Sequence, residues 1–581
     1  MNHLATKITA AVIIAAAAFL AINSSWDDSF IVDEIPHVGA GYSYVTKGDY
    51  RLNPEHPPLA KDLAGLALLF LDINQSAFET PVWKDNVNDQ WNFGRNLIFG
   101  SGNNAILITH VAKFPMLLFF VLSAIIIFVW TRKLYGNGAG LISVFLFSLS
   151  PTVLAHSRFV TTDIPALFGV LLSSYFFIKY LEQPTRKGLW LAGISFGIAQ
   201  LTKFSLILLV PYFIAVALMW AIAHRDIVRS LARTITVMAI GFIFVVWPVY
   251  YLHTMNYPAQ RQQNDTASLL GSYGNKTLRE IEIKAAGVPV IRAMAQYGLG
   301  LMMVSQRSGG GNTTYFMGEV RSQAWKEYFP IVYFIKEPLA FWILALVVFI
   351  GLGSRASLKW PRNIKDIIRK NFVEFALLGW LAIYWITSIQ ANLNIGVRHL
   401  MPVYGFTFIL ISGQISNIYQ NVSKQKKIVL ASTLVAILGW YAYENIASYP
   451  YYLAYFNQSA GGPAGGHRYV ADSNLDWGQD LKRLSDWTDG SGIKKIYLDY
   501  FGWSDPYYYL KDKYVWININ SFSSEEDFLS RHPEGGYIAI SGTFLMQSLD
   551  SSKPNYLWLY AKKPTVVVGN SIFVWKVAGS R

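Results

Sequence analysis

The chain has 581 residues, of which 53% are hydrophobic and only 15% are charged. Because a soluble domain carries about 25% charged residues and the hydrophobic excess comes in long blocks, the composition excludes an ordinary soluble protein and predicts several membrane spans. The formal net charge of +13 does not indicate nucleic acid as a partner, since the basic residues cluster in short loops between hydrophobic blocks. The chain has no cysteine, which excludes disulfides and thiolate metal sites.

The first hydrophobic block follows Lys7 and covers residues 8–25. It could be a cleaved signal peptide or an uncleaved span. We favour the span, because many further blocks follow and no small-residue cleavage site stands out. Blocks of about 20 residues predict the other spans near residues 112–131, 138–156, 163–181, 188–202, 204–223, 232–252, 331–352, 372–390, 400–418 and 428–447. The predicted fold class is therefore mainly α, a polytopic membrane protein of about 11 transmembrane helices.

Lysine and arginine in the short connections set the expected orientation. They follow every second span, at Arg132 and Lys133, Arg186 and Lys187, Arg225 to Arg233, Arg355 to Lys370, and Lys424 to Lys427. By parity these connections share one side, which we take as cytoplasmic. Residues 1–447 would then form one transmembrane domain with two long outer loops, 26–111 and 253–330. The second loop, with the sequence SQRSGGGNTTYF, shows no clear pattern and is expected to be flexible enough to close over a site.

The C-terminal segment, residues 448–581, is expected to be a small soluble α/β domain on the outer side. Its segments KKIYLDYF, GGYIAISG and TVVVGNSIFVWKV predict strands. The segment GQDLKRLSDW predicts an amphipathic helix. A turn-rich stretch, SAGGPAGGHR, precedes them and is typical of a hinge.

The first outer loop carries several polar residues that suit chemistry at a membrane edge. They are Asp33, Glu34, His37, Glu55 and His56. Charge at this level must be satisfied by water, a partner or a substrate. The apolar stretch that follows, residues 56–71, is too short to span and predicts an interfacial helix on the outer face. Glu55 and His56 would also suit a divalent cation, but one such pair is a weak ligand set, and we assign no metal site.

Further charged residues fall at the outer ends of later spans. They are Arg158, Asp163, Lys203, Arg398 and His399. The predicted topology brings them to the same membrane face as the first loop, where acidic and basic groups would form a pocket for a phosphate beside a reacting hydroxyl. The simpler alternative is that Arg158 and Lys203 are snorkelling anchors and that the histidines only make local hydrogen bonds.

Missing motifs narrow the function. The chain has no P-loop, no dinucleotide fingerprint, no H-E-x-x-H and no D-x-D. An outer-facing site would also meet little nucleotide sugar, so an activated donor should arrive as a lipid phosphate. Three alternatives stay open: a transporter or flippase, a polymerase or ligase of envelope glycans, and a non-catalytic assembly protein. A transporter would favour charges near the bilayer midplane and two related halves, and the sequence shows neither.

One stretch, VDEIPHVGAGYSYVTKGDYRLNPEHPPLAKDL, resembles the first outer loop of GT-C membrane glycosyltransferases. The most similar groups are the protein O-mannosyltransferases of family 39 and the bacterial aminoarabinose transferases of lipid A. The resemblance implies that Asp33 is a catalytic base that contacts the acceptor, with Glu34 beside it. RFVTTD looks like the second outer turn of that family, which would place Arg158 on the donor phosphate and Asp163 on the acceptor side. Lys203 matches a basic residue implicated in phosphate binding.

The resemblance also implies a reaction. It would be an inverting transfer of a monosaccharide from a polyprenyl-phosphate donor to a hydroxyl of a protein, lipid or glycan. We expect Arg398 to join the donor-phosphate site, and His37, Glu55, His56 and His399 to contact substrates. The expected location is a bacterial inner membrane, with the active site and the C-terminal domain facing the periplasm.

Overall fold

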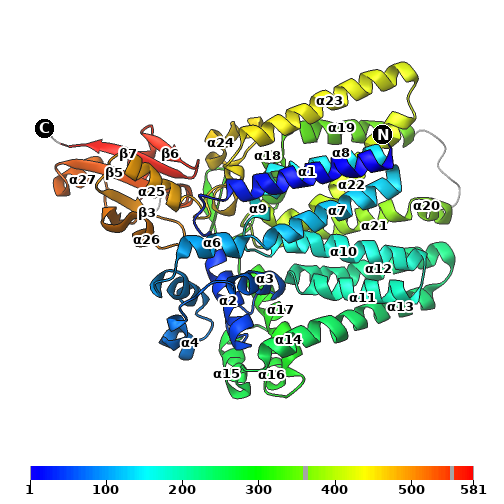
Figure 1. Ribbon diagram of the computed structural model, residues 1–581, viewed down its shortest axis with the longest axis horizontal. Coiled ribbons are helices and arrows are strands. Elements are labelled where there is room, and N and C mark those ends of the chain that lie inside the picture. Colours follow the sequence, from blue (N-terminus) through cyan, green and yellow to red (C-terminus); the bar gives the residue numbers. More distant parts are fainter. Residues whose placement is uncertain (1, 357–363, 550–554, 580–581) are drawn as a thin grey trace.

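In this computed structural model, residues 2–356, 364–549 and 555–579 are described. Figure 1 shows a bundle of long helices, with shorter helices and the C-terminal sheet gathered toward one end of it. The bundle contains α1 (His3–Ser24), α7 (Met116–Tyr135), α8 (Asn137–Ser148), α9 (Pro151–Ser157), α10 (Asp163–Glu182), α11 (Arg186–Gln200), α12 (Leu209–His224), α13 (Ile227–Gly241), α14 (Trp247–Thr254), α18 (Tyr328–Lys336), α19 (Leu339–Ala356), α20 (Ile364–Lys370), α21 (Phe372–Gln390), α22 (Met401–Gln420) and α23 (Lys424–Ala447).

The candidate membrane spans are fewer than the sequence predicts. Among the described residues, seven helical segments are long and apolar enough to cross a membrane, or up to nine if each of two bent helix pairs is one span. The predicted spans 188–202 and 400–418 correspond to α11 and α22, which are not in that set, and α11 has only 15 residues. Both helices pack inside the bundle, α11 against α10 and α13, and α22 against α7 and α8. The protein is thus mainly helical and multi-pass.

A bend between α8 and α9 shapes the outer end of the bundle. The two helices meet at 62°. Ser150 caps α9 by accepting a hydrogen bond from the amide of Val153, and Pro151 occupies the first turn, where its missing N–H costs nothing. The bend delivers the turn of residues 158–162 to the start of α10. This turn begins with Arg158, and Asp163 follows it as the first residue of α10.

The outer loops are largely helical. The first contains α2 (Glu34–Lys47), α3 (Leu59–Leu68), α4 (Pro81–Lys84), α5 (Gln90–Arg95) and α6 (Ala105–Lys113). The second contains α15 (Ala259–Leu269), α16 (Lys276–Ala286), α17 (Arg292–Gly310) and the hairpin of β1 (Thr314–Phe316) and β2 (Glu319–Arg321). The expectation of an unpatterned second loop is therefore wrong: SQRSGG completes α17, and the left-handed Gly311, at φ 78°, ends it.

Close packing of α2 on α3 fixes the first outer loop. A Cβ atom at Gly41 would collide with the carbonyl of Lys61, and one at Gly65 would collide with the carbonyl of Gly41. Glycine at both positions thus lets the two helices touch, which holds the intervening residues 48–58 against the bundle. The short helix predicted for residues 56–71 is present as α3, and it is followed by the exposed Leu69 and Phe70. Its insertion into the bilayer surface stays a prediction.

The C-terminal segment contains a five-stranded mixed sheet of order β4-β3-β5-β7-β6. Its strands are β3 (Ile496–Asp499), β4 (Tyr514–Trp516), β5 (Gly535–Ser541), β6 (Val566–Val568) and β7 (Ile572–Ala578), and its helices are α24 (Gly462–Gly465), α25 (Leu481–Gly490), α26 (Pro506–Leu510), α27 (Glu525–Arg531), α28 (Gly542–Gln547) and α29 (Leu557–Tyr560). Strands β3, β4 and β5 are parallel, whereas β7 is antiparallel to both of its neighbours. The segments predicted as strands contain β3, β5, β6 and most of β7, and α25 overlaps the predicted helix, residues 478–487, and continues to Gly490.

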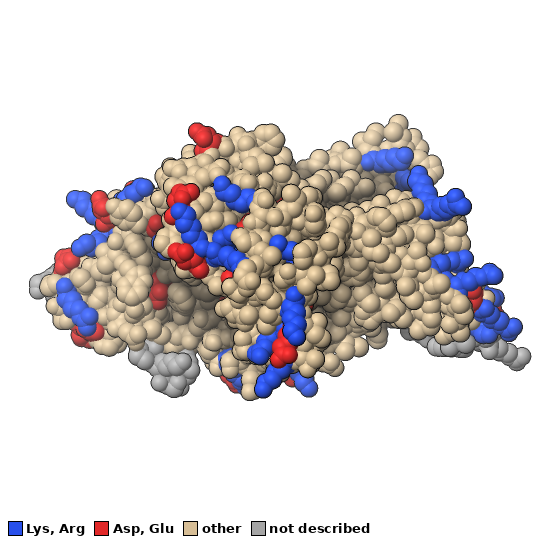
Figure 2. All heavy atoms as spheres, turned by 90° about the horizontal axis from the view of Figure 1, so that it is seen from below, with Lys and Arg blue, Asp and Glu red and all other residues tan. Residues whose placement is uncertain are grey.

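Charge is distributed unevenly along the bundle. Figure 2 shows lysine and arginine gathered at the end farthest from the C-terminal sheet, whereas acidic and basic residues mix around the other end. The surface between them carries few charges in this view. Part of the predicted basic connection, residues 357–363, lies outside the described residues. The pattern matches a membrane belt with a basic end.

Candidate active site

A cavity of about 420 Å³ lies where the outer loops meet the bundle. Its walls come from segments far apart in sequence: the start of α2, the loop before α3, the turn before α10, the turn before α12, α17, the end of α21, and the turn before α22. Seven of the predicted site residues line it: Asp33, His37, Glu55, His56, Lys203, Arg398 and His399. Asp163 is buried directly behind two of them, Lys203 and Arg398.

Two cations and two carboxylates alternate along one wall of this cavity. Arg398 Nη1 lies 2.7 Å from Asp33 Oδ2 and 3.7 Å from Asp163 Oδ2. Lys203 Nζ donates to Asp163 Oδ1 at 2.6 Å. The Asp33 side chain is 24% exposed, but that of Asp163 is 1% exposed. Only Asp33 is therefore open to a substrate hydroxyl, whereas Asp163 is placed to hold the two cations.

Three histidines contribute neutral rings. The rings of His37 and His56 meet edge to face, with centroids 5.0 Å apart. Burial lowers the pKa of His37 and lowers the pKa of His56 and His399 well below the ordinary value. His37 Nδ1 lies 2.7 Å from the carbonyl oxygen of Val160. Because a carbonyl oxygen can only accept, a neutral His37 ring carries its proton on Nδ1 and donates it to Val160. These rings can thus exchange hydrogen bonds with a substrate without adding positive charge.

A buried lysine holds the loop that carries Glu55 and His56. Lys61 Nζ donates to the carbonyl oxygens of Asn53 at 2.8 Å and of His56 at 2.7 Å. Burial lowers the pKa of Lys61 to about 7. Glu55 Oε1 accepts from Gln90 Nε2 at 2.5 Å, which ties the loop to α5. The cavity wall at this point is therefore fixed by polar contacts rather than left mobile.

Arg307 is a wall residue that the sequence reasoning missed. It lies near the end of α17 and lines the cavity. In the described part of the chain no acidic side chain lies within ion-pair distance of it, in contrast to Lys203 and Arg398. Its positive charge is thus free for an anion. The signal was present, because SQRSGGG puts a lone arginine between polar residues, but without the helix no direction could be assigned to its side chain.

Apolar residues also line the cavity. They are Phe204, Ile207, Leu208, Leu301 and Val304. They come from the turn before α12 and from α17. A ligand with a charged head and an apolar chain would match this mixed lining.

Glu34 and Arg158 point elsewhere. Glu34 is fully buried and accepts hydrogen bonds from the amides of Ile31 at 3.0 Å and Val160 at 2.9 Å, so it joins the start of α2 to the turn before α10. Arg158 Nη2 lies 3.3 Å from Asp28 Oδ2, and Nη1 donates to Ser24 Oγ at 2.8 Å. Neither residue lines the cavity described above.

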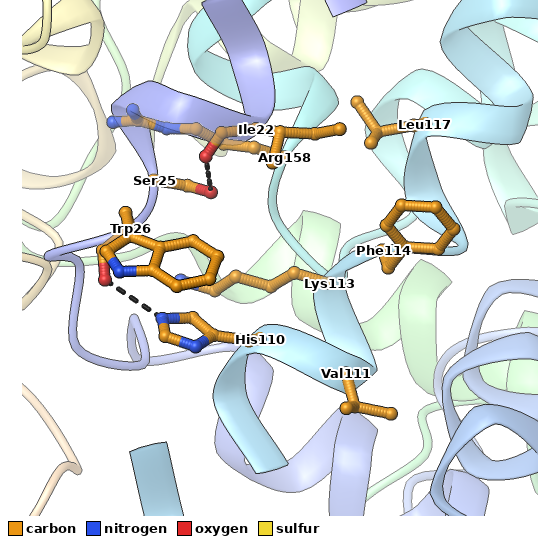
Figure 3. Close-up of a pocket in the computed structure, with 9 residues that line it drawn as sticks. All are labelled: Ile22, Ser25, Trp26, His110, Val111, Lys113, Phe114, Leu117 and Arg158. Atoms are coloured by element: carbon orange, nitrogen blue, oxygen red, sulfur yellow. Dashed lines mark hydrogen bonds between the residues drawn. The ribbon is translucent and has the colours of Figure 1, made fainter. Parts of the chain in front are cut away.

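Arg158 instead borders a second pocket, of about 230 Å³, between α1, α6 and the start of α7. Figure 3 shows its side chain alongside Ile22 and Ser25, with the Trp26 indole stacked on the His110 ring. Lys113 also lines this pocket, and its side chain passes behind Trp26 in this view. The walls are mostly aliphatic and aromatic, so this pocket differs in character from the charged cavity.

Part of the chain is similar in sequence to known mannosyltransferases. A family model described as dolichyl-phosphate-mannose-protein mannosyltransferase matches residues 97–251. Dolichyl-phosphate-mannose–protein mannosyltransferase 1 of Saccharomyces cerevisiae is 27% identical over 189 residues, which is 31% of this chain and 20% of that protein. The match thus spans about a fifth of the length of the yeast protein.

The fold is shared over a much longer stretch than the sequence. The S. cerevisiae Pmt1-Pmt2 complex bound to the sugar donor has a chain that matches at a TM-score of 0.53 and 12% identity, covering 84% of this chain and 92% of that one. At this identity the match shows a shared fold over most of both chains. ArnT of Cupriavidus metallidurans, bound to undecaprenyl phosphate, also aligns, over 98% of this chain and 99% of its own, at 10% identity and a TM-score of 0.46.

The family match covers only part of the candidate site. Arg158, Asp163 and Lys203 lie inside residues 97–251, whereas Asp33 and Arg398 lie outside them. The structure joins the two sets through the ion pairs of Arg398 and Asp163. Among the described residues there is no group of three or more His, Asp or Glu side chains that could hold a metal ion.

Replacing Arg158 by alanine should destabilise this protein more than it affects donor binding. The change would leave Asp28 buried with Arg483 as its remaining ion-pair partner, at 2.7 Å. Breaking a buried pair typically costs about 3–5 kcal/mol. Thermal unfolding of the purified protein should shift to lower temperature, while the KM for donor stays within about twofold of wild type. A large rise in donor KM without loss of stability would instead put Arg158 on the donor phosphate.

Proposed function

We propose that this protein is an inverting glycosyltransferase that moves a monosaccharide from a polyprenyl-phosphate donor to an acceptor hydroxyl. One observation carries the proposal: Asp33, a partly exposed carboxylate, lines one cavity together with three cationic and several apolar side chains. A base for the acceptor, a site for a phosphate and a place for a lipid chain are thus adjacent. The matching family and the matching yeast protein are both named for dolichyl-phosphate-mannose, a donor of this class.

The reaction would be a single displacement. Asp33 takes the proton of the acceptor hydroxyl while its oxygen attacks the anomeric carbon. The bond from that carbon to the phosphate oxygen breaks, and the polyprenyl phosphate leaves with the bonding pair. One displacement inverts the configuration of the sugar. General-base assistance of this kind contributes about 10²–10⁴-fold. Arg398, 2.7 Å from Asp33, orients the carboxylate.

The leaving phosphate needs positive charge as the bond breaks. Lys203, Arg398 and Arg307 line the cavity and can supply it. Preorganised charges aimed at a developing anion are usually the largest electrostatic contribution to catalysis. An arginine can also bind two phosphate oxygens at once through its planar fork. Asp163, paired with Lys203 and close to Arg398, would keep both cations in place when no donor is bound.

Replacing Arg307 by glutamine should weaken donor use. Within the described part of the chain, Arg307 has no acidic side chain at ion-pair distance. Its positive charge is therefore available to bind the donor phosphate. We expect donor KM to rise about tenfold, since a charge-assisted hydrogen bond is worth about 1.5–3 kcal/mol. Arg321→Gln is the matched control, because Arg321 is an exposed arginine of the same outer loop that pairs with Glu319. Equal kinetics for both variants would remove Arg307 from the donor site.

The active cavity would face the non-cytoplasmic side. The basic end of the bundle lies opposite the C-terminal sheet (Figure 2), whereas the cavity is lined by residues of the outer loops, and basic connections favour the cytoplasmic side. We propose a bacterial inner membrane, with the cavity and the C-terminal domain in the periplasm. The acceptor would be a protein, a lipid or a glycan of the cell envelope.

A release assay tests the function. Purified protein in lipid nanodiscs is given polyprenyl-phosphate hexoses and pentoses together with envelope extracts, and free polyprenyl phosphate is measured. Donor-dependent release with sugar in the acceptor fraction supports transfer. A flippase would move the donor between leaflets of vesicles without releasing polyprenyl phosphate, and that result would contradict the proposal. Mass analysis of envelope glycans with and without the protein would then identify the sugar.

A further inference from the structure

A segment of the C-terminal domain, residues 472–481 with the sequence DSNLDWGQDL, lies behind the cavity wall and contacts Arg398 and the residues just before Asp33, on the two sides of their ion pair. We call it the bridging segment. It is anchored in its own domain, because the amide of Asp472 donates to Thr543 Oγ1 at 3.0 Å and Asp480 Oδ2 accepts from Ser571 Oγ at 2.6 Å. Thr543 and Ser571 both lie at the end of the sheet nearest the segment.

On one side the bridging segment holds Arg398. Ser473 Oγ accepts a hydrogen bond from Arg398 Nε at 3.1 Å, and the Trp477 ring lies 4.0 Å from the guanidinium carbon. A cation over the face of tryptophan is attracted by the ring. Ser473 also donates to the carbonyl of Ile395, just before the turn that carries Arg398. Gly396 between them adopts φ 144°, and a Cβ there would collide with Ser473 Oγ.

The turn that carries Arg398 is held as well. Asn474 Oδ1 accepts from the amide of Val397 at 2.9 Å, and Asn474 Nδ2 donates to Tyr328 Oη at 2.9 Å. Ser473 and Asn474 are fully buried. The backbone and the side chain of this arginine therefore both depend on two consecutive residues of the C-terminal domain.

On the other side the bridging segment holds the residues that lead to Asp33. The amide of Val32 donates to the carbonyl of Trp477 at 3.0 Å, and the amide of Ser29 donates to that of Gln479 at 2.9 Å. Ser29 Oγ donates to the carbonyl of Gly478 at 2.8 Å. Asp33 is therefore the first residue after a stretch that is paired along its length with the bridging segment.

We propose that the bridging segment is a positioning element of the active site, so that the C-terminal domain completes the catalytic centre. It would set the distance and angle between Asp33 and Arg398 from both ends. Small errors in such a geometry are costly, since a misplacement of about 1 Å can reduce a rate about a hundredfold. The kinetic test of this inference rests on the proposed glycosyl transfer, whereas its structural test, amide hydrogen exchange, does not.

Two substitutions test the proposal in the full-length protein. Ser473→Ala removes the acceptor for Arg398 Nε, and Trp477→Leu removes the aromatic face. Each should lower kcat about tenfold or more, with donor KM changed less than about twofold. Trp477→Phe keeps a ring and should stay within about threefold of wild-type kcat. Ser485→Ala is the control for stability, because Ser485 is a buried serine of the same domain that donates to the carbonyl of Tyr509 at 2.8 Å, away from the cavity.

Amide hydrogen exchange provides a readout that needs no substrate. Peptides covering residues 29–34 and 394–400 should exchange faster in Ser473→Ala and Trp477→Leu than in wild type, but not in Ser485→Ala. If the wild-type protein transfers no sugar, the proposed function fails, and the exchange result alone decides the positioning role. Unchanged exchange in these peptides for both variants would overturn the inference, and so would a loss of kcat in Ser485→Ala equal to that in Ser473→Ala.

Discussion

Asp33→Asn should reduce sugar transfer by at least about a hundredfold, which is the lower part of the range for losing a general base. An amide has nearly the shape of a carboxylate but cannot take a proton from the acceptor. Asparagine can still accept the hydrogen bond from Arg398 Nη1 that Asp33 accepts at 2.7 Å, so the cavity should keep its form. The measurement is kcat for polyprenyl-phosphate release in nanodiscs, with thermal unfolding as the check on folding.

A nearby aspartate provides the control for Asp33→Asn. Asp27 lies six positions earlier, is 52% exposed at its side chain, and pairs with Lys482 at 2.8 Å on the outer surface. Asp27→Asn makes the same chemical change in the same segment without touching the cavity. It should leave kcat within about twofold of wild type, as for an ordinary surface pair. Near-normal turnover in Asp33→Asn would show that another group is the base.

The location of the cavity could be predicted from the sequence, but the direction of individual side chains could not. Hydrophobic blocks and basic connections place Asp33, Lys203 and Arg398 at the same membrane face, and the structure brings them to one wall. Asp33 and Glu34, by contrast, are adjacent in sequence and diverge in space. Consecutive residues at a helix start do not share a face, so only one of the two can face the cavity, and the pattern alone does not say which.

The other differences between the predicted and the observed site come from contacts between residues that are far apart in the sequence. Arg158 turns to Asp28, which precedes it by 130 positions, and no local signal marks that pair. Arg307 lies on α17, and the polar, glycine-rich sequence around it does not predict this helix. Ser473 and Trp477 act through hydrogen bonds and ring contacts with a turn some 75 residues earlier. Contacts of this range depend on how the elements pack, and periodicity within one element carries no information about them.

The number of membrane spans is another feature that the pattern within single elements does not determine. A hydrophobicity pattern treats each apolar block as an independent crossing. Helices α11 and α22 each pack against several other helices, so part of their surface never meets lipid and need not be strongly apolar. The bent pair α18–α19, at 111°, begins at the outer loop and turns sharply before entering the bundle. Packing in the bundle thus relaxes the composition that a lone span would require.

Lys203→Met should lower transfer by about 10²–10³-fold, the usual cost of removing a preorganised charge from a developing anion. It should also destabilise the protein, because Lys203 Nζ is the hydrogen-bonded partner of the buried Asp163, at 2.6 Å. Asp163 would keep only Arg398, at 3.7 Å. Loss of one partner of a buried pair costs about 3–5 kcal/mol, since the other charge stays buried. Loss of rate in this variant alone therefore cannot separate catalysis from folding.

A double substitution separates the two effects. Asp163→Asn together with Lys203→Met removes both charges, so the uncompensated carboxylate disappears and stability should recover toward wild type. If Lys203 stabilises the leaving phosphate, transfer by the double variant stays low, because the cation is still missing. Lys203→Arg, which keeps the charge, should retain measurable transfer with near-normal stability. Recovery of transfer in the double variant would mean that Lys203 serves only to neutralise Asp163, and the phosphate site would then rest on Arg307 and Arg398.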